Sequence, residues 1–182
     1  QLSGGMQQRV GLARALATDA PILLMDEAFS ALDPLIRTDM QNILLDLQKD
    51  LHKTIVFITH DLDEALRIGD NIAILRDGKI IQKGNPQEII MKPADDYISD
   101  FIKDINRGKV IEVKSIMQKG TSKGAPLDSS SSLEDALKIL NNEKNNECSV
   151  IDDKGKKIGK VTLDAAISAL FREKSLKKLE KY

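Results

Sequence analysis

The sequence predicts an α/β protein in which helices flank a mainly parallel sheet, followed by a small α+β module. Apolar residues run without interruption over 22–25 and again, after Thr54, over 55–58. Short continuous apolar runs are typical of strands that are buried on both faces of a parallel sheet. Apolar residues at helical spacing separate these runs, and a strand–turn–strand–helix pattern follows residue 147. These observations together define the expected fold class.

Length and composition set the outer limits. The chain has 182 residues, which suffices for one full domain or two small ones. No apolar run approaches the roughly 18 residues of a membrane span, so any membrane role is expected to be peripheral. No secretory signal is expected, and the single cysteine, Cys148, cannot form an internal disulfide. The run 147–151, which ends in the apolar residues Val150 and Ile151, predicts that Cys148 packs in the core. A reducing cytoplasm is the expected compartment.

The first residues have the features of a helix start. Ser3 can cap a helix, and Gly4 and Gly5 leave bare backbone N–H groups at its first turn. Such a terminus can bind phosphate, because the helix dipole and the unpaired N–H groups favour an anion. An ordinary capped helix is the alternative. Four apolar residues at helical spacing predict the buried face: Met6, Val10, Ala13 and Ala17.

Two adjacent carboxylates, Asp26 and Glu27, follow the first predicted strand. In open α/β sheets, ligands bind beyond the carboxyl ends of such strands. Mg²⁺ prefers carboxylate oxygens, and a water that attacks a phosphoryl group needs a base to orient it. Asp26 can therefore serve a metal and Glu27 a water. Two solvated acids after a strand are the alternative.

The next elements place a histidine at the same sheet end. Asp33 before Pro34 predicts an N-cap and the first residue of a helix. The second strand ends at His60, and Asp61 and Glu64 are spaced as a capping box. Apolar spacing predicts the core face of the intervening helix: Ile36, Met40, Ile43, Leu47 and Leu51.

The remaining elements are shorter. Asp77 and Gly78 lie between two apolar runs and predict a hairpin. Asn85 opens a short helix, and a further apolar face is predicted at Tyr97, Ile98, Phe101, Ile102 and Ile105. Residues 107–109 are a candidate hinge, and residues 118–132 read as a loop. Beyond it the sequence predicts a helix that starts at Ser131 and Glu134, strands at 148–151 and 158–162 around a turn at 152–155, and a helix at 163–171.

Several of these segments, in this order, resemble the motifs of ATP-binding cassette (ABC) ATPases. They correspond to the signature motif (residues 2–9), the Walker B strand (22–27), the D-loop (30–33) and the switch histidine (59–61). Residues 5–16 and 26–37 are similar to the ATPase subunit of glycine betaine/proline importers. The pattern at 148–171 resembles a CBS module, a regulatory domain of the cystathionine-β-synthase type. We therefore expect a partial ABC ATPase domain at 1–106, and a hinge with a single CBS-like module at 107–182.

This resemblance implies a role for each motif. Glu27 is the expected catalytic base, His60 reaches the γ-phosphate of ATP, and Asp26 holds Mg²⁺. Five residues are expected to bind the ATP of a second ATPase subunit in a head-to-tail dimer: Ser3, Gly4, Gly5, Gln7 and Asp33. The other implied partners are transmembrane permease subunits and, through the complex, a substrate-binding protein. The implied location is the cytoplasmic face of the membrane.

The implied function is ATP hydrolysis that drives uptake of glycine betaine or proline-type osmolytes. An importer for another solute, such as an amino acid, is the alternative, although most of these lack the CBS-like tail. A non-transport ABC protein of DNA repair or translation would carry long coiled-coil insertions or a duplicated cassette. Neither occurs, so no nucleic-acid partner is expected. A stand-alone CBS binding module is contradicted by residues 1–105.

Charge is unevenly distributed along the chain. Residues 1–108 hold 12 basic and 17 acidic side chains, net −5, and residues 109–182 hold 15 and 11, net +4. A solvated surface explains such a bias, and so would a nucleotide or anionic lipid at the CBS-like module. The final basic run comprises Arg172, Lys174, Lys177, Lys178 and Lys181.

The chain starts with Gln1 inside a motif, so we expect its natural start to lie upstream. No Gly-x-x-x-x-Gly-Lys-[Ser/Thr] loop occurs in it, and that loop normally cradles the β- and γ-phosphates. We therefore predict that residues 1–182 alone do not hydrolyse ATP. Phosphate release by the purified chain with ATP and Mg²⁺ checks this, and magnesium-dependent turnover above a no-protein blank would contradict it.

Overall fold

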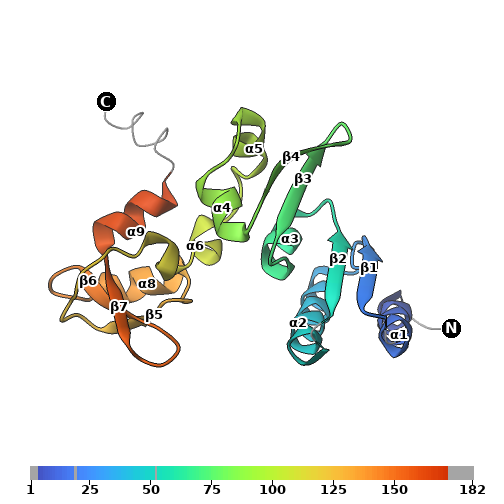
Figure 1. Ribbon diagram of the computed structural model, residues 1–182, viewed down its shortest axis with the longest axis horizontal. Coiled ribbons are helices and arrows are strands. Elements are labelled where there is room, and N and C mark those ends of the chain that lie inside the picture. The colour runs from blue at the N-terminus through green and yellow to red at the C-terminus, as the bar shows by residue number, and fades with distance from the viewer. Residues whose placement is uncertain (1–3, 19, 52, 172–182) are drawn as a thin grey trace. The chain divides into compact units, whose positions relative to one another are not determined.

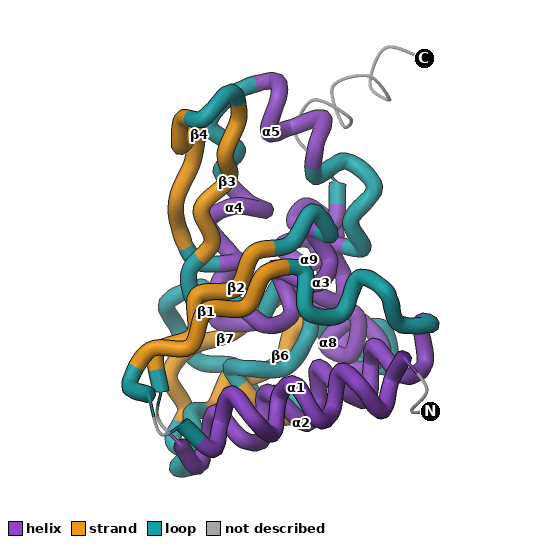
Figure 2. Tube along the Cα trace, turned by 90° about the vertical axis from the view of Figure 1, so that its right-hand side faces the viewer, coloured by secondary structure: helices purple, strands orange, loops and turns teal. Residues whose placement is uncertain are grey.

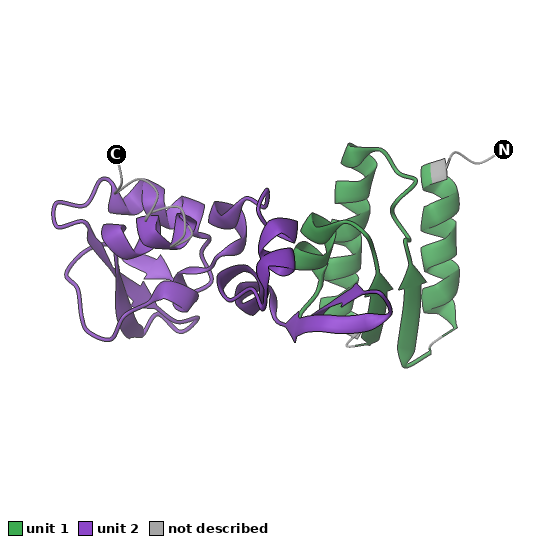
Figure 3. Ribbon diagram, turned by 90° about the horizontal axis from the view of Figure 1, so that it is seen from above, with its two compact units in different colours: residues 1–70 green, residues 71–182 purple. Residues whose placement is uncertain are grey.

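The computed structural model describes residues 4–18, 20–51 and 53–171. These residues form both helices and strands (Figure 1), so the α/β class is confirmed. Their strands form a parallel pair, an antiparallel pair and a mixed three-stranded sheet rather than the one mainly parallel sheet that was predicted. The chain divides into two compact units, residues 1–70 and residues 71–182 (Figure 3). The division at residue 106, which the sequence predicts between two domains, stays a prediction.

The first unit is built on a pair of parallel strands. β1 (Ile22–Asp26) and β2 (Thr54–Ile58) pair in register, with Ile22 opposite Thr54 and Asp26 opposite Ile58. Parallel neighbours need a crossover connection, and α2 (Pro34–Leu51) supplies it. α1 (Gly4–Ala17) precedes β1, and α3 (Leu62–Ile68) follows β2.

The core of this unit lies on one side of the strands. α1 and α2 lie on the same side of β1 and β2 (Figure 2), where Leu23 and Met25 are buried. Ile22 and Leu24 point the other way and are 55% and 75% exposed. The prediction that β1 is buried on both faces is therefore wrong for the described residues, because successive strand side chains alternate between faces and both helices cover the same face.

The buried faces of the two helices also differ from prediction. In α1, Met6 and Val10 are exposed, whereas Leu12 is buried in the core. The predicted residues Ala13 and Ala17 are likewise exposed. This helix carries apolar residues on two sides, so spacing alone does not select the side that packs. In α2, Met40 is buried as predicted, but the next core position is Leu44 rather than the exposed Ile43.

The second unit begins with a hairpin, as predicted. β3 (Ile72–Arg76) and β4 (Lys79–Gly84) are antiparallel, and Asp77 and Gly78 join them with positive φ angles of 51° and 73°. Positive φ at both central residues is the geometry that two-residue hairpins favour. α4 (Pro86–Met91) follows with a complete capping box between Asn85 and Glu88.

The helices that follow are short. α5 (Asp96–Phe101) buries Ile98 and leaves Tyr97 and Phe101 stacked at the surface. α6 (Arg107–Val110) occupies the candidate hinge, where Gly108 is buried. A Cβ on Gly108 would lie 3.5 Å from side chains of Glu134 and Leu170, so this turn is closely packed. The hinge role of 107–109 stays a prediction.

The rest of the unit is a three-stranded sheet with helices. Its strand order is β5 (Pro126–Asp128), β6 (Glu147–Ile151) and β7 (Lys157–Thr162), parallel then antiparallel. α7 (Val113–Ile116) precedes the sheet, and α8 (Leu133–Leu140) and α9 (Leu163–Leu170) complete the unit. β5 lies within the segment that was predicted to be loop.

Two local predictions for this region can be compared directly. The cap of α8 is Ser132, which accepts a hydrogen bond from the amide of Asp135, so the predicted start at Ser131 and Glu134 is wrong by one residue. Cys148 is fully buried in β6, as predicted, and burial raises the pKa of its thiol. The described helices include none that is long and apolar enough to cross a membrane.

Candidate functional site

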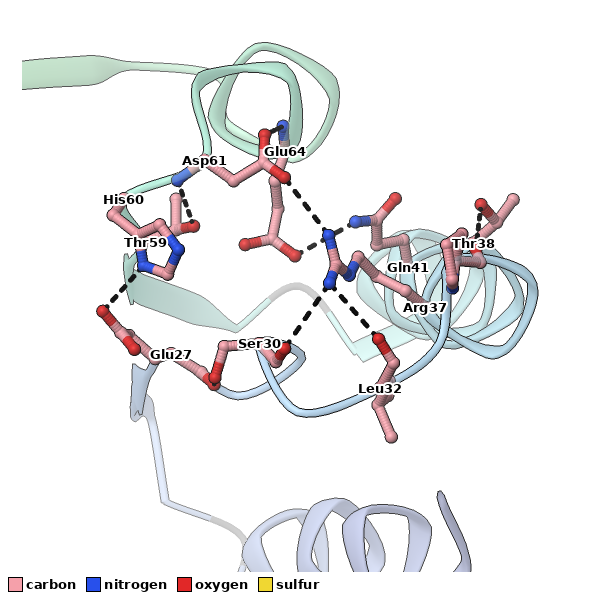
Figure 4. Close-up of polar contacts among 11 residues, drawn as sticks. Glu27, Ser30, Leu32, Arg37, Thr38, Gln41, Thr59, His60, Asp61 and Glu64 are labelled. Carbon is pink, nitrogen blue, oxygen red and sulfur yellow. Dashed lines mark hydrogen bonds and ion pairs between the residues drawn. The ribbon is translucent and has the colours of Figure 1, made fainter. Parts of the chain in front are cut away.

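The parallel register brings Glu27 and His60 together. Asp26 is paired with Ile58, and the amide of Glu27 donates to the carbonyl of Ile58 at 2.9 Å, which extends the ladder one residue beyond β1. The chain then leaves both strands at the same sheet edge. His60 Nδ1 lies 2.9 Å from Glu27 Oε1 (Figure 4). The sequence prediction that these residues share one sheet end is confirmed.

The backbone of Glu27 has an unusual conformation. Its φ angle is 44°, in the left-handed region that few residues other than glycine adopt. The turn is closed by Ser30, whose amide and hydroxyl both donate to the carbonyl of Glu27, at 3.1 and 2.9 Å. A strained residue held by surrounding contacts is a feature of functional sites. Here it aims the carboxylate at His60.

The pair is open to solvent. The side chains of His60 and Glu27 are 73% and 48% exposed, so a substrate can reach both. The hydrogen bond that His60 donates to Glu27, and then the negative charge of Glu27, raise the pKa of His60. The imidazole is therefore protonated over a wider pH range than an isolated histidine. With Nδ1 engaged by Glu27, Nε2 is the ring nitrogen that can contact a substrate.

Asp26 lies at the end of β1 with an exposed side chain. It borders a cavity of about 470 Å³ between α1 and β1, which is mostly apolar and includes Gln7. Within the described chain no group of three or more His, Cys, Asp or Glu side chains is placed to hold a metal. Mg²⁺ usually takes only one or two protein carboxylates and completes its shell with water and phosphate oxygens. The single carboxylate of Asp26 at this position fits this coordination of Mg²⁺.

The residues expected to serve a partner's nucleotide lie elsewhere in the unit. Gly4 and Gly5 are in the first turn of α1, and a Cβ on Gly5 would lie 3.3 Å from the side chain of Ile36 in α2. Asp33 caps α2, because its Oδ1 accepts from the amides of Leu35 and Ile36 at 3.2 and 3.1 Å. The predicted cap is confirmed. Ser3 lies outside the described residues.

The predicted capping box at the start of α3 is only half formed. Asp61 Oδ1 accepts from the amide of Glu64 at 3.2 Å, as expected. The Glu64 side chain does not return to Asp61 and instead accepts from Gln41 Nε2 at 3.0 Å in a buried contact. Thr59 Oγ1 accepts a hydrogen bond from the amide of Asp61 at 3.0 Å. Tertiary pairing with α2 therefore replaces the local contact.

Sequence reasoning missed Arg37, which contacts three groups around this site (Figure 4). One signal was present in the sequence. Arg37 falls in the first turn after the cap Asp33, where the helix dipole disfavours a cation. A cation at that position indicates acceptors elsewhere in the structure.

The sequence model of the family described as "ABC transporter" matches residues 1–30.

Individual relatives are more specific. The chain is 66% identical over 117 residues to the glycine betaine/carnitine transport ATP-binding protein GbuA of Listeria monocytogenes, which covers 64% of this chain and 30% of that protein. It is 47% identical over 176 residues to the glycine betaine/proline betaine transport system ATP-binding protein ProV of Escherichia coli, covering 97% of this chain and 44% of ProV. The chain thus spans less than half the length of either relative.

A solved structure also matches in part. It is the dimeric post-hydrolysis state of the ATP-binding cassette MJ0796 bound to ADP and Pi. The sequences are 41% identical over 47% of this chain and 37% of that one, with a TM-score of 0.43. The overlap is too partial to define the fold of this chain.

The contact between Glu27 and His60 predicts how a substitution of Glu27 changes the pKa of His60. Glu27→Gln should lower the pKa of His60 toward its usual value of about 6.5, because the amide removes the negative charge. The folded pKa of His60 lies above the unfolded one. The contact of protonated His60 with Glu27 therefore contributes fully to the free energy of unfolding below the unfolded pKa of His60. That contribution is lost as pH rises through the folded pKa. A ¹H–¹⁵N NMR titration of the ring checks this, and an unchanged pKa in the variant would contradict it.

Proposed function

We propose that this chain forms part of an ATP-hydrolysing subunit that drives uptake of glycine betaine or proline-type osmolytes through an ABC importer. The observation that carries the proposal is the 2.9 Å contact between Glu27 and His60 at the ends of two parallel strands. The substrate class is supported by the names of relatives that share 47% and 66% identity with the chain.

Phosphoryl transfer requires positioning and charge stabilisation more than covalent chemistry. In this proposal Glu27 orients the attacking water and accepts its proton. His60, held by Glu27 through Nδ1, presents Nε2 to the γ-phosphate of ATP. Asp26 supplies one carboxylate to Mg²⁺, which would neutralise charge on the phosphates when bound. The exposure of the Glu27 and His60 side chains leaves room for the nucleotide.

The proposal includes a second ATPase subunit in a head-to-tail dimer. Ser3, Gly4, Gly5, Gln7 and Asp33 would bind the ATP of that partner. Gly4 and Gly5 at the start of α1 can offer backbone N–H groups to phosphate. Asp33 is exposed although it caps α2, so it can contact a partner while it stabilises its own helix.

We assign residues 107–182 a regulatory role as a single CBS-like module. Contacts within the second unit tie this segment to α4. Gln87 in α4 donates to the carbonyl of Val110 at 2.7 Å and accepts from the amide of Glu112 at 3.1 Å. Arg107 donates to the carbonyls of Ile90 and Ala169 at 2.8 and 2.9 Å. A change in the module could therefore displace α4.

The proposed location is the cytoplasmic face of the membrane, with permease subunits and, through them, a substrate-binding protein. The basic run from Arg172 to Lys181 lies outside the described residues, and only its charge enters this proposal. Each lysine near an anionic leaflet contributes about 1 kcal/mol to membrane binding. Salt limits the range of this attraction to a Debye length of roughly 8–10 Å. An anionic lipid is thus one candidate ligand, and a nucleotide at the module is another.

The catalytic assignment predicts that Glu27→Gln, in a subunit of the relatives' length, lowers ATP turnover by a factor on the order of 10² or more. The amide keeps the shape of the side chain but cannot accept the proton. Steady-state phosphate release by the assembled complex measures the effect.

A matched control is Asp39→Asn, which neutralises an exposed carboxylate on α2 away from the pair and should leave turnover within about twofold. If Glu27→Gln turns over at a rate near that of the wild type, Glu27 is not the base.

The regulatory assignment predicts that removal of residues 109–182 abolishes activation of transport by rising internal salt. Uptake by the intact complex in liposomes, at stepped internal salt, is the measurement. Replacing Lys174, Lys177, Lys178 and Lys181 with Gln separates the basic run from the rest of the module. A truncated complex that keeps the full salt response would place the sensor elsewhere.

A further inference from the structure

The Arg37 guanidinium joins two loops that are far apart in sequence. Arg37 Nη2 donates to the carbonyls of Ser30 and Leu32, at 3.4 and 3.2 Å. Its Nη1 pairs with Asp61 Oδ2 at 3.3 Å. Figure 4 shows the guanidinium between the two segments. Ser30 and Leu32 belong to the loop that follows Glu27, and Asp61 directly follows His60.

These contacts close a ring through the catalytic pair. Ser30 donates twice to the carbonyl of Glu27, and Arg37 binds the carbonyl of Ser30. Arg37 also binds Asp61, the neighbour of His60, and His60 contacts the Glu27 carboxylate at 2.9 Å. A closed circuit of short contacts fixes distances that a single contact leaves free. Arg37 therefore adds a second connection between the Glu27 loop and the His60 turn, besides the pairing of β1 with β2.

The placement of Arg37 is electrostatically costly, which argues for a positional role. It lies in the first turn of α2, where the helix dipole disfavours a cation. Its side chain is 30% exposed, and within the described chain its Nε is buried without a hydrogen-bond acceptor. A planar guanidinium can hold several oxygens in fixed directions, which the point charge of lysine cannot do.

The carboxylate of Asp61 divides its two oxygens between tasks. Oδ1 caps α3 by accepting from the amide of Glu64, and Oδ2 pairs with Arg37. One helical turn further along α2, Gln41 bonds to Glu64 in a buried contact. Beyond that, Arg67 donates to Asn42 at 2.7 Å. Within the described residues, these three polar contacts connect α2 with α3 and its cap, and of the three the Arg37–Asp61 contact is the one whose guanidinium also binds the loop after Glu27.

We propose that Arg37 is a positioning residue that holds the loop of residues 30–33 and the His60 turn at the spacing that ATP hydrolysis requires. The proposal rests on the function proposed above. It extends to Asp33, because this residue ends the same loop and is assigned to the partner's nucleotide. A displacement of the loop at the partner's site would then reach His60 through Arg37 and Asp61.

The first test concerns geometry and needs no nucleotide. In residues 1–182, Arg37→Met and Asp61→Asn should shift the amide NMR signals of residues 30–33 and the ring signals of His60. Arg67→Met removes a polar contact between the same helices and should leave both sets unchanged. Asn at position 61 can still cap α3, so Asp61→Asn isolates the charge pair from the helix start.

The second test measures catalysis by the complete subunit in its complex. Arg37→Met should lower kcat by about 10- to 100-fold, since a misplacement near 1 Å can cost that much. The KM for ATP should stay within about twofold, because the described contacts of Arg37 are with Ser30, Leu32 and Asp61 of its own chain. Arg37→Lys should recover less than half of the lost rate. Asp61→Asn should also lower kcat. The kcat of the double variant should be no lower than that of Arg37→Met alone.

The outcomes separate this proposal from the proposed function. If Glu27→Gln abolishes turnover while Arg37→Met stays within twofold of wild type, Arg37 does not position the site. If the losses in kcat caused by Arg37→Met and Asp61→Asn multiply in the double variant, the proposal is also overturned. Shifted NMR signals together with a Glu27→Gln variant that retains turnover would uphold the geometry and reject Glu27 as the catalytic base. Should Arg37→Met fail to fold, Asp61→Asn and Arg37→Lys carry both tests.

Discussion

The register of β1 and β2 is the constraint on which the candidate site depends. Asp26 pairs with Ile58, and the amide of Glu27 donates to the carbonyl of Ile58. The segments after β1 and β2 therefore leave the sheet side by side at the same edge. Glu27 and His60 then meet although 33 residues separate them. A slip of one residue would exchange the two faces of a strand and bury the exposed Leu24 in place of Leu23 and Met25. The same core that packs Met25 against α1 and α2 therefore fixes the site.

α2 connects the two strands and also organises the polar groups around their ends. Its cap, Asp33, closes the loop after Glu27, and Arg37 and Gln41 on the next turns bind the start of α3. Stability and site geometry are thus coupled in one helix. The buried pair of Gln41 and Glu64 shows the physical reason, because a buried carboxylate needs a donor and α2 supplies it.

The second unit shows a similar use of side chains to join segments distant in sequence. Gln87 satisfies main-chain groups at Val110 and Glu112, and Arg107 connects carbonyls of Ile90 and Ala169. The last carbonyls of a helix have no partner within that helix, and here the long side chains of Gln87 and Arg107 donate to such carbonyls at the ends of α4, α6 and α9. The contacts make α4, α6 and α9 one packed assembly within this unit.

Local sequence patterns predict the strands other than β5, the caps at Asp33 and Asp61, the hairpin at Asp77 and Gly78, and the placing of Glu27 and His60 at one sheet end. These depend on local patterns: apolar runs, short polar caps and turn residues. Only the tertiary structure decided that Leu12 rather than Met6 packs in the core, that Glu64 pairs with Gln41 rather than with its own helix start, and that Arg37 joins two loops. Each of these depends on which element lies opposite, and residue spacing within one segment carries no information about that neighbour.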